Sequence, residues 1–524
     1  MLPVIAITLY YIIPNRILQY LFIFFSFRAA LFFFKKLFPA RHGAIVRVLS
    51  FTIPLFYATI YTSFSRSDGK NKMDSNRLTV GILTLGCKVN QYESEAVAEE
   101  LVRRGHSVLT ADGSCDAYII NTCTVTAEAA RKSRQMVRRL RSRAPGAFIV
   151  VTGCLAETAP DELAAIAGVD AVVGNSKKLA VADEIDRLAA SGRGAPAAVL
   201  RDIGTLGGST FEPMSISSFA RTRVYIKVED GCENRCSYCI IPDARGPVRS
   251  KPQAAVLDEI SGLVRGGTRE VVITGIEVAS YGRDLGNTSL EELVCAVDAL
   301  PGIRENNVRV RLGSLEPSLL RPEFIERISK LGSLAPHFHI SLQSGCSRTL
   351  AAMRRKYNAE RAMQVINDLR AAIPGVQFTC DVIVGFPGET DRDFAETLDF
   401  MRRARFLAAH IFPYSPRRGT PAAEMKDQIP EEEKHRRSAI LSEAAGEIRK
   451  EILAEAVRDF PDTRVLFEAF DGVTASGHTD SFIEVRVPSD KNLHGMLLPI
   501  RLDGVAVDKA YEYGSVCTGK TKQI

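Results

Sequence analysis

A chain of 524 residues is too long for one ordinary domain, and its length indicates three or four domains with large cores. Residues 1–72 contribute +8 to the net charge of +6, so the remaining residues carry −2 and exclude nucleic-acid binding through bulk charge. Eleven cysteines without a secretory cleavage pattern favour a reducing cytoplasm and exclude a disulfide framework.

Residues 1–75 form a hydrophobic leader. Two stretches, 17–34 and 44–62, approach the length of a membrane span, but each carries an internal arginine. An arginine near a bilayer centre costs about 2.5 to 3.5 kcal/mol. Two interpretations stay open: a membrane anchor, or upstream sequence from a mis-assigned start with the protein beginning near Met73. We favour the second, because ordinary soluble sequence follows.

Strand-length apolar runs alternate with helical patterns over residues 76–200. Strands are expected at 78–83, 117–120 and 147–152, with a helix at 93–104. This alternation predicts an α/β domain with a parallel sheet. Residues 201–219, which belong to a stretch rich in Gly, Ser and Pro, are expected to be a linker.

The alternation restarts over residues 220–460. Helical patterns separate most of six candidate strands, at 223–228, 270–274, 307–312, 337–342, 377–384 and 408–413. Six β/α units predict a partial barrel with its site at the carboxyl ends of the strands. Short alternating strands over 461–524 predict a small C-terminal β-barrel.

A compact cysteine group, Cys232, Cys236 and Cys239, follows the first barrel strand. This C-x3-C-x2-C spacing supplies three thiolates to a four-iron four-sulfur cluster and leaves one iron free to chelate a small molecule. The alternatives are plain surface cysteines or a zinc site, but zinc usually needs a fourth protein ligand nearby. The triplet resembles the signature of the radical S-adenosylmethionine enzymes.

A second, scattered group consists of Cys87, Cys123 and Cys154, each just beyond a predicted strand. Because the carboxyl ends of parallel strands share one edge of a sheet, the three thiols can converge there. They could hold a second four-iron cluster with one open iron. The alternative is three buried structural cysteines.

Motifs around both groups resemble the methylthiotransferases of the radical S-adenosylmethionine class, from about Leu78 to the C-terminus. TLGCKVNQYESE at 84–95, NTCTVT at 121–126 and IIPDARGPVRS at 240–250 are similar to the enzymes that act on N6-threonylcarbamoyladenosine in tRNA. The isopentenyladenosine enzymes typically have a TYGCQMN-like first motif, and those acting on a ribosomal protein a TLGCPKN-like one. Asp243 departs from the family pattern, which often has an aromatic residue there.

The resemblance implies a division of labour between the two cysteine groups. The central cluster would bind S-adenosylmethionine and generate a 5′-deoxyadenosyl radical that removes the hydrogen on carbon 2 of the adenine. The N-terminal cluster would offer a sulfur, methylated by a second S-adenosylmethionine. No catalytic residue beyond the cluster ligands is implied. Cofactor contacts are expected at Thr274, Gly275, Ser314, Gln343, Gly385 and Glu389, although each could belong to a plain turn.

Cations crowd the predicted helix that follows Cys123. We expect tRNA phosphates to contact this helix, at Arg131, Arg134, Arg138 and Arg141. The alternative is a solvated helix face. The C-terminal β-barrel resembles the TRAM domain, an RNA-binding module; alternatively, it is a folding cap on the barrel.

The sequence therefore predicts an enzyme that transfers a methylthio group to carbon 2 of N6-threonylcarbamoyladenosine next to the anticodon in tRNA. It would use two [4Fe-4S] clusters, S-adenosylmethionine and an electron donor such as flavodoxin or ferredoxin. It would be cytoplasmic, or membrane-anchored if the leader is genuine. One alternative is the same chemistry on isopentenyladenosine or on a ribosomal protein aspartate. Another is a non-catalytic iron-sulfur RNA-binding redox sensor.

Overall fold

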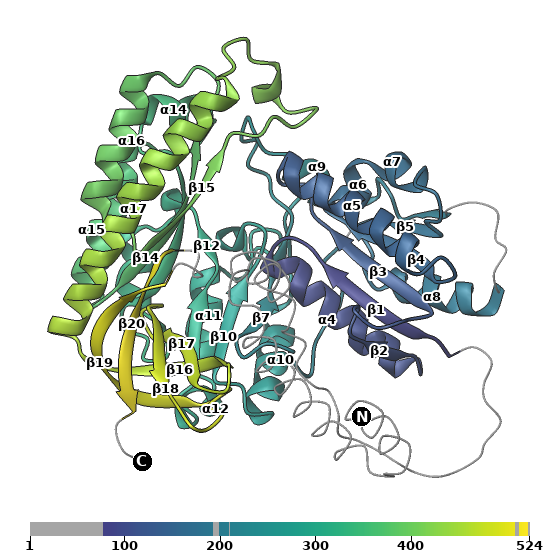
Figure 1. Cartoon of the computed structure of the whole chain (residues 1–524), viewed down its shortest axis with the longest axis horizontal. Helices are drawn as coiled ribbons and strands as arrows, with labels where there is room; N and C mark the ends of the chain where they lie inside the picture. Colours follow the sequence, from purple (N-terminus) through teal and green to yellow (C-terminus); the bar gives the residue numbers. More distant parts are fainter. Residues whose placement is uncertain (1–76, 192–198, 209, 509–512, 522–524) are drawn as a thin grey trace, which may run out of the picture. The chain divides into compact units, whose positions relative to one another are not determined.

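The computed structural model describes residues 77–191, 199–208, 210–508 and 513–521 (Figure 1). The two apolar stretches of the leader lie outside these residues. Within the described ranges no helix is both long enough and apolar enough to cross a membrane. Residues from Met73 onward belong to one compact unit.

The N-terminal domain is built on a parallel sheet with the strand order β2-β1-β3-β4-β5-β6. Its strands are β1 (Thr79–Thr84), β2 (Ser107–Leu109), β3 (Ala117–Thr122), β4 (Phe148–Gly153), β5 (Ala171–Val173) and β6 (Val199–Arg201). The central strand β3 is buried at every position, as a strand covered on both faces must be. The predicted α/β domain with a parallel sheet is confirmed.

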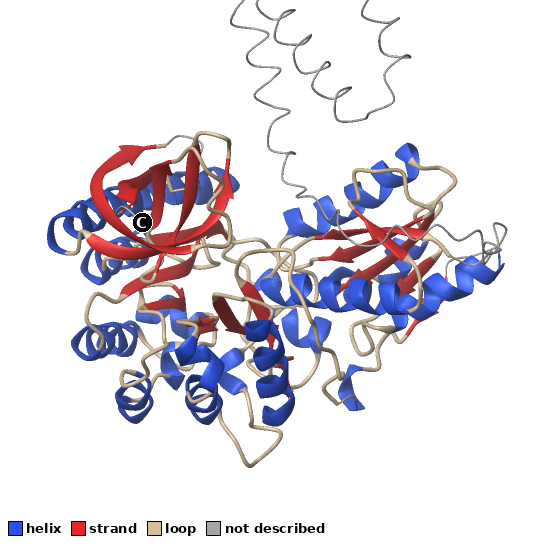
Figure 2. Cartoon of the chain, turned by 90° about the horizontal axis from the view of Figure 1, so that it is seen from below, coloured by secondary structure: helices blue, strands red, loops and turns tan. Residues whose placement is uncertain are grey.

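Helices cover both faces of this sheet (Figure 2). One face packs against α4 (Lys88–Arg103) and α8 (Ala180–Ser191). The other packs against α5 (Ala127–Arg143), α6 (Cys154–Thr158) and α7 (Pro160–Ala164). Helix α4 begins five residues before the expected start at residue 93. Buried polar residues such as Asn90 and Glu93 hide its apolar periodicity.

All six predicted barrel strands are present in the central domain. They form two parallel sheets, with orders β11-β10-β7 and β12-β13-β14-β15. The six predicted strands are β7 (Val224–Lys227), β10 (Glu270–Thr274), β11 (Arg309–Leu312), β13 (His337–Gln343), β14 (Gln377–Val384) and β15 (Ala408–Pro413), and the short β12 (Ser314–Leu315) is an additional strand. A bridge between Val310 and Leu334 lies at the junction of the two sheets.

The helices of this domain cover one side of its strands. They are α10 (Gln253–Arg265), α11 (Leu290–Asp298), α12 (Pro301–Glu305), α13 (Pro322–Ile328), α14 (Ser347–Ala352), α15 (Ala359–Ala372), α16 (Asp391–Ala404) and α17 (Glu431–Asp459). Short elements complete it: β8 (Glu229–Asp230), β9 (Arg249–Ser250), α9 (Ile241–Arg245), η4 (Val278–Ser280), η5 (Pro317–Leu319) and η6 (Pro421–Glu424).

The barrel strands have an apolar outer face and a polar inner face. On β13, Phe338, Ile340 and Leu342 are completely buried in the core shared with the helices. Because side chains alternate along a strand, His337 and His339 point to the opposite, inner face. The same alternation puts Arg311 of β11 and Asp381 of β14 on that face.

The segment expected to be a linker packs against the protein. It contains the short helix η3 (Leu206–Gly208), and Met214 and Ile216 are buried in the central core. The hydroxyl of Tyr92 donates to the carbonyl oxygen of Met214 at 3.1 Å. The segment thus helps to join α4 to the central domain.

The C-terminal residues form the predicted small barrel, which is closed in the order β16-β17-β18-β20-β19. Its strands are β16 (Asp462–Phe470), β17 (Thr474–Thr479), β18 (Glu484–Pro488), β19 (Leu497–Val507) and β20 (Ser515–Thr521). Val485 and Val487 belong to its core, which is shared with Ile452 and Leu453 of α17.

Phe482 packs the small barrel against the central domain. Its ring stacks on His337 at 4.4 Å and on His478 at 4.7 Å between centroids. The guanidinium carbons of Arg223 and Arg311 each lie 5.0 Å from the centre of the same ring. Its φ of 73° is uncommon for a bulky residue, so these contacts hold a strained backbone.

Candidate functional site

The three N-terminal cysteines meet at the carboxyl edge of the first sheet. Cys87 precedes α4, Cys123 follows β3, and Cys154 opens α6. The Cys123 thiol interacts electrostatically with those of both Cys87 and Cys154. A Cβ atom on Gly86 would lie 3.1 Å from the Cys123 sulfur, so glycine lets the first loop approach the second.

The central triplet lies in the loop between β8 and α9. The backbone N–H of Cys232 donates to the carbonyl oxygen of Gly246 at 3.0 Å, and that of Ser237 donates to Met353 at 3.0 Å. Gly231 has a φ of 90°, and a Cβ atom there would lie 1.9 Å from the carbonyl oxygen of Pro247. Backbone hydrogen bonds at its start and at its middle therefore hold the loop in place.

The donor sets suit an iron-sulfur cluster better than a single zinc ion. Among the described residues, no three cysteine sulfurs all lie within 4.8 Å of one another. A tetrahedral zinc ion with sulfur ligands at about 2.3 Å would bring them to about 4 Å. Each set offers three thiols, the number of protein ligands that a four-iron cluster with one open iron takes.

Burial keeps three of the six thiols protonated until a metal binds. It raises the pKa of Cys232 and Cys239 to about 12, and that of Cys123 to about 11. Metal binding must then displace the protons. Two arginines contact two of the remaining sulfurs: Arg245 Nε donates to the sulfur of Cys154 at 3.3 Å, and Arg355 Nη1 donates to that of Cys236 at 3.2 Å.

Buried charges join the two cysteine groups. Arg245, fully buried at the end of α9, also pairs with Glu93 of α4 and with Asp230, two residues before Cys232. Lys227 Nζ lies 2.7 Å from Glu93 and 2.6 Å from Asp230. Helix α9, which follows Cys239, packs against α6, which begins at Cys154. We call Glu93, Lys227, Asp230 and Arg245 the bridging network.

The expected cofactor residues lie at the same end of the barrel as the triplet. Thr274 and Gly275 end β10, Ser314 begins β12 and is exposed, Gln343 ends β13 with a φ of 64°, and Gly385 follows β14. Glu389 accepts the N–H of Gly385 at 2.7 Å and pairs with Arg437 of α17 at 2.7 Å. Its carboxylate is thus already engaged in holding the turn after β14.

An acidic group beside the triplet escaped the sequence analysis. Asn234 Nδ2 donates to Glu316 at 3.0 Å and to Glu277 at 3.3 Å. Burial and the charge of Glu316 raise the pKa of Glu277 to about 7. Glu229 Oε1 is buried without a hydrogen bond. These carboxyls can accept hydrogen bonds from a ligand. In the sequence, only their positions at or just after strand ends could have marked them as site residues.

The arginines of the basic helix α5 differ in how accessible they are and in whether they have partners. Arg131 pairs with Glu128, and Arg134 lies 3.5 Å from Glu162. Arg138 is exposed, and the structure gives it no partner in the described part of the chain. Arg141, in contrast, donates to the carbonyl oxygens of Pro145 and Gly168. Its guanidinium is therefore engaged in packing the domain.

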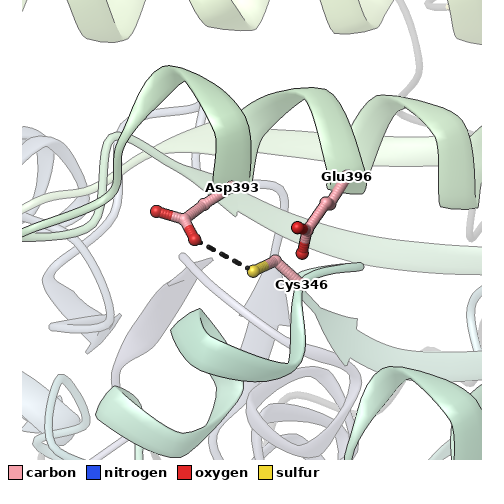
Figure 3. A group of neighbouring side chains, drawn as sticks. All are labelled: Cys346, Asp393 and Glu396. Atoms are coloured by element: carbon pink, nitrogen blue, oxygen red, sulfur yellow. Dashed lines mark hydrogen bonds between the residues drawn. The ribbon is translucent and has the colours of Figure 1, made fainter.

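Cys346, Asp393 and Glu396 form the one group in the described residues that resembles a mononuclear metal site (Figure 3). Cys346 lies 3.2 Å from Asp393. The Asp393 carboxylate, however, pairs with Arg348 and accepts from the N–H of Thr390 at 2.7 Å in a capping box. The group is explained by the start of α16.

Lys88, next to Cys87, is the remaining cation of the first motif. It is accessible to solvent but largely surrounded by protein. Burial, and repulsion from Arg223 and Arg311, lower its pKa to about 8. It also interacts with Asp381.

Comparisons with known families agree with this geometry. Residues 226–401 match the radical SAM superfamily model, and residues 79–174 match the model of "Uncharacterized protein family UPF0004". The barrel and its triplet thus define a radical S-adenosylmethionine enzyme, a class that uses that cofactor with a four-iron cluster.

Curated relatives narrow the class. The chain is 36% identical to threonylcarbamoyladenosine tRNA methylthiotransferase MtaB of Bacillus subtilis over 81% of this chain and 93% of that protein. The chain is 41% identical to the enzyme of the same name from Thermotoga maritima, over 72% of this chain and 85% of that protein. It is 33% identical to a tRNA-2-methylthio-N(6)-dimethylallyladenosine synthase of Acetivibrio thermocellus, over 80% of this chain and 88% of that protein. The chain belongs to the radical S-adenosylmethionine tRNA methylthiotransferase family.

Proposed function

We propose that this enzyme transfers a methylthio group to carbon 2 of N6-threonylcarbamoyladenosine next to the anticodon in tRNA. The observation that carries the proposal is the contact between the two cysteine groups, made by α6 against α9 and by Arg245 on Cys154. Sulfur insertion by a radical route needs a hydrogen-abstracting centre and a sulfur-delivering centre beside one substrate atom. The TLGCKVNQYESE motif and the MtaB relatives favour this substrate.

Each cysteine group has residues suited to its part. Cys232, Cys236 and Cys239 would hold a four-iron cluster that, with S-adenosylmethionine, would supply the radical. Cys87, Cys123 and Cys154 would hold a second cluster that, with a second S-adenosylmethionine, would supply the methylated sulfur. Arg355 and Arg245 offset thiolate charge in the two sites. We also propose that Thr274, Gly275, Ser314, Gln343 and Gly385 line the cofactor end of the barrel.

We propose tRNA as the macromolecular partner and a low-potential protein such as flavodoxin or ferredoxin as the electron donor. Helix α5 starts four residues after Cys123, and its N-terminal N–H, on Ala127, donates to Ser415 of the central domain at 3.0 Å. Arg131, Arg134 and Arg138 can therefore reach phosphates near the joint of the two domains. The half-exposed ring of Phe412, near His410, offers a surface on which a base can stack.

Mass spectrometry of tRNA nucleosides from a deletion strain tests the substrate. We expect the strain to lose the methylthio group from N6-threonylcarbamoyladenosine, and the wild-type chain to restore it. A triple alanine variant of Cys232, Cys236 and Cys239 should not. Loss from isopentenyladenosine instead would assign the other tRNA substrate, and unchanged tRNA would favour the ribosomal protein. A redox sensor would form no 5′-deoxyadenosine after anaerobic reconstitution.

A further inference from the structure

Arg245 places a buried cation against a sulfur of the N-terminal cysteine set. Its Nε atom donates to the sulfur of Cys154 at 3.3 Å. Both side chains are buried, Arg245 completely and Cys154 to all but 3% of its surface. Because the contact is shielded from water, the charge of the guanidinium acts on the sulfur with little screening.

Acceptors on both domains fix the direction of this guanidinium. Nη2 donates to Asn90 Oδ1 at 2.5 Å and to Glu93 at 3.2 Å, and both of these residues belong to α4. Nη1 lies 3.4 Å from Asp230, in the central domain. An arginine is planar and rigid, so acceptors on its two Nη atoms direct the remaining Nε hydrogen at Cys154.

The carboxylates of the bridging network are shared among several cations. Glu93 contacts Lys227 at 2.7 Å and Lys178 at 3.6 Å as well as Arg245. Asp230 contacts Lys227 at 2.6 Å and Arg245 at 3.4 Å. Two buried carboxylates thus serve three buried cations, so they leave part of the positive charge beside Cys154 uncompensated.

We infer that Arg245 raises the reduction potential of the iron-sulfur cluster that Cys87, Cys123 and Cys154 would hold. It is a positioning residue that acts through Cys154, and the inference rests on the proposed function, which assigns a cluster to these cysteines. Reduction adds negative charge to a cluster. Hydrogen bonds to ligand sulfurs and nearby positive charge stabilise the reduced form, and Arg245 supplies both.

The test uses the full-length chain with Cys232, Cys236 and Cys239 changed to Ala, so that reconstitution fills the N-terminal set alone. The midpoint potential of the cluster is measured anaerobically by EPR while the ambient potential is lowered. We expect Arg245→Gln to shift the midpoint to more negative values, because Gln carries no charge. Arg245→Lys keeps the charge and should give a smaller shift in the same direction.

Lys227→Gln is the matched control. It removes one positive charge from the same buried network, but Lys227 Nζ donates to Glu93 and Asp230 and not to a cysteine. We expect it to shift the midpoint less than Arg245→Gln does. Glu93→Gln removes a carboxylate that offsets the guanidinium, so it should shift the midpoint to less negative values. Loosened packing would not make the direction of the shift follow the sign of the removed charge.

An unchanged midpoint in Arg245→Gln, or a shift no larger than that of Lys227→Gln, overturns the inference. Should Arg245→Gln fail to hold iron, Arg245→Lys and Glu93→Gln decide, and unchanged midpoints in these two overturn it as well. The proposed function fails separately. A parent chain that binds no iron removes the N-terminal cluster and the proposed function with it. A parent with about four iron atoms whose midpoint does not respond to Arg245 removes only the inference.

Discussion

The Nε atom of Arg245 donates a hydrogen bond to the sulfur of Cys154 at 3.3 Å, across 91 residues of sequence. Arg245 ends the helix that follows the central triplet, and Cys154 is in the N-terminal set. The same guanidinium forms ion pairs with Glu93 and Asp230, and all three side chains are buried. One side chain thus fixes the separation and the electrostatic environment of the two candidate cluster sites.

Replacing Arg245 with Gln should destabilise the iron-free enzyme. Glu93 and Asp230 would lose one of their buried cations, a change that costs about 3 to 5 kcal/mol when a buried ion pair is broken. Denaturant-induced unfolding measures it. Arg103→Gln is the control, because Arg103 is exposed and its ion-pair partner is the helix neighbour Glu100. Equal unfolding midpoints for both variants would show that the network does not hold the domains together.

The cysteine groups should contribute separately to iron content. Reconstituted anaerobically, the wild type should hold about eight iron atoms, as two four-iron clusters. Changing Cys87, Cys123 and Cys154 together to Ala should leave about four, and the same change at the central triplet should also leave about four. Iron and sulfide analysis measures this. Full iron in the N-terminal variant would make those cysteines structural and remove the proposed sulfur-delivering centre.

Much of the fold could be predicted because strands in parallel sheets are short, apolar and separated by helices. The convergence of Cys87, Cys123 and Cys154 could be anticipated for the same reason, since each follows a strand. The start of α4 could not, because its buried face carries Asn90 and Glu93 in place of apolar residues. Part of what satisfies those polar residues comes from the second domain, through Arg245 and Lys227.

Residue roles were harder to predict than positions. Arg141 looks identical to Arg138 in sequence, yet only Arg141 reaches the carbonyl oxygens of a neighbouring loop. Glu389 was expected near the cofactor, but Arg437, 48 residues later, engages its carboxylate. Glu277 and Glu316 were missed because only folding brings them together beside Asn234. In each case the partner is distant in sequence, so local pattern carries no signal.

Phe482 should secure the C-terminal barrel to the central domain. Phe482→Ala removes two ring stackings and two contacts with guanidinium groups, which together are worth about 2 to 3 kcal/mol. We expect faster hydrogen exchange in β17 and β18 without a change in β3. Phe460→Ala, at an exposed phenylalanine just before the barrel, is the control. Unchanged exchange in the Phe482 variant would mean that α17 alone holds the barrel.

Helix α5 should provide phosphate contacts through Arg131, Arg134 and Arg138, because these arginines remain accessible. Changing all three to Gln should weaken tRNA binding and flatten the plot of log affinity against log salt by about 0.7 to 0.9 per lost contact. The matched control changes Arg392, Arg402 and Arg403 of α16 to Gln, which removes the same charge from exposed positions elsewhere. Because counterion release follows contacts and not net charge, only the α5 variant should lose slope. Equal slopes in the two variants would mean that the arginines of α5 form an ordinary solvated helix face. The RNA contacts would then be expected in the C-terminal barrel.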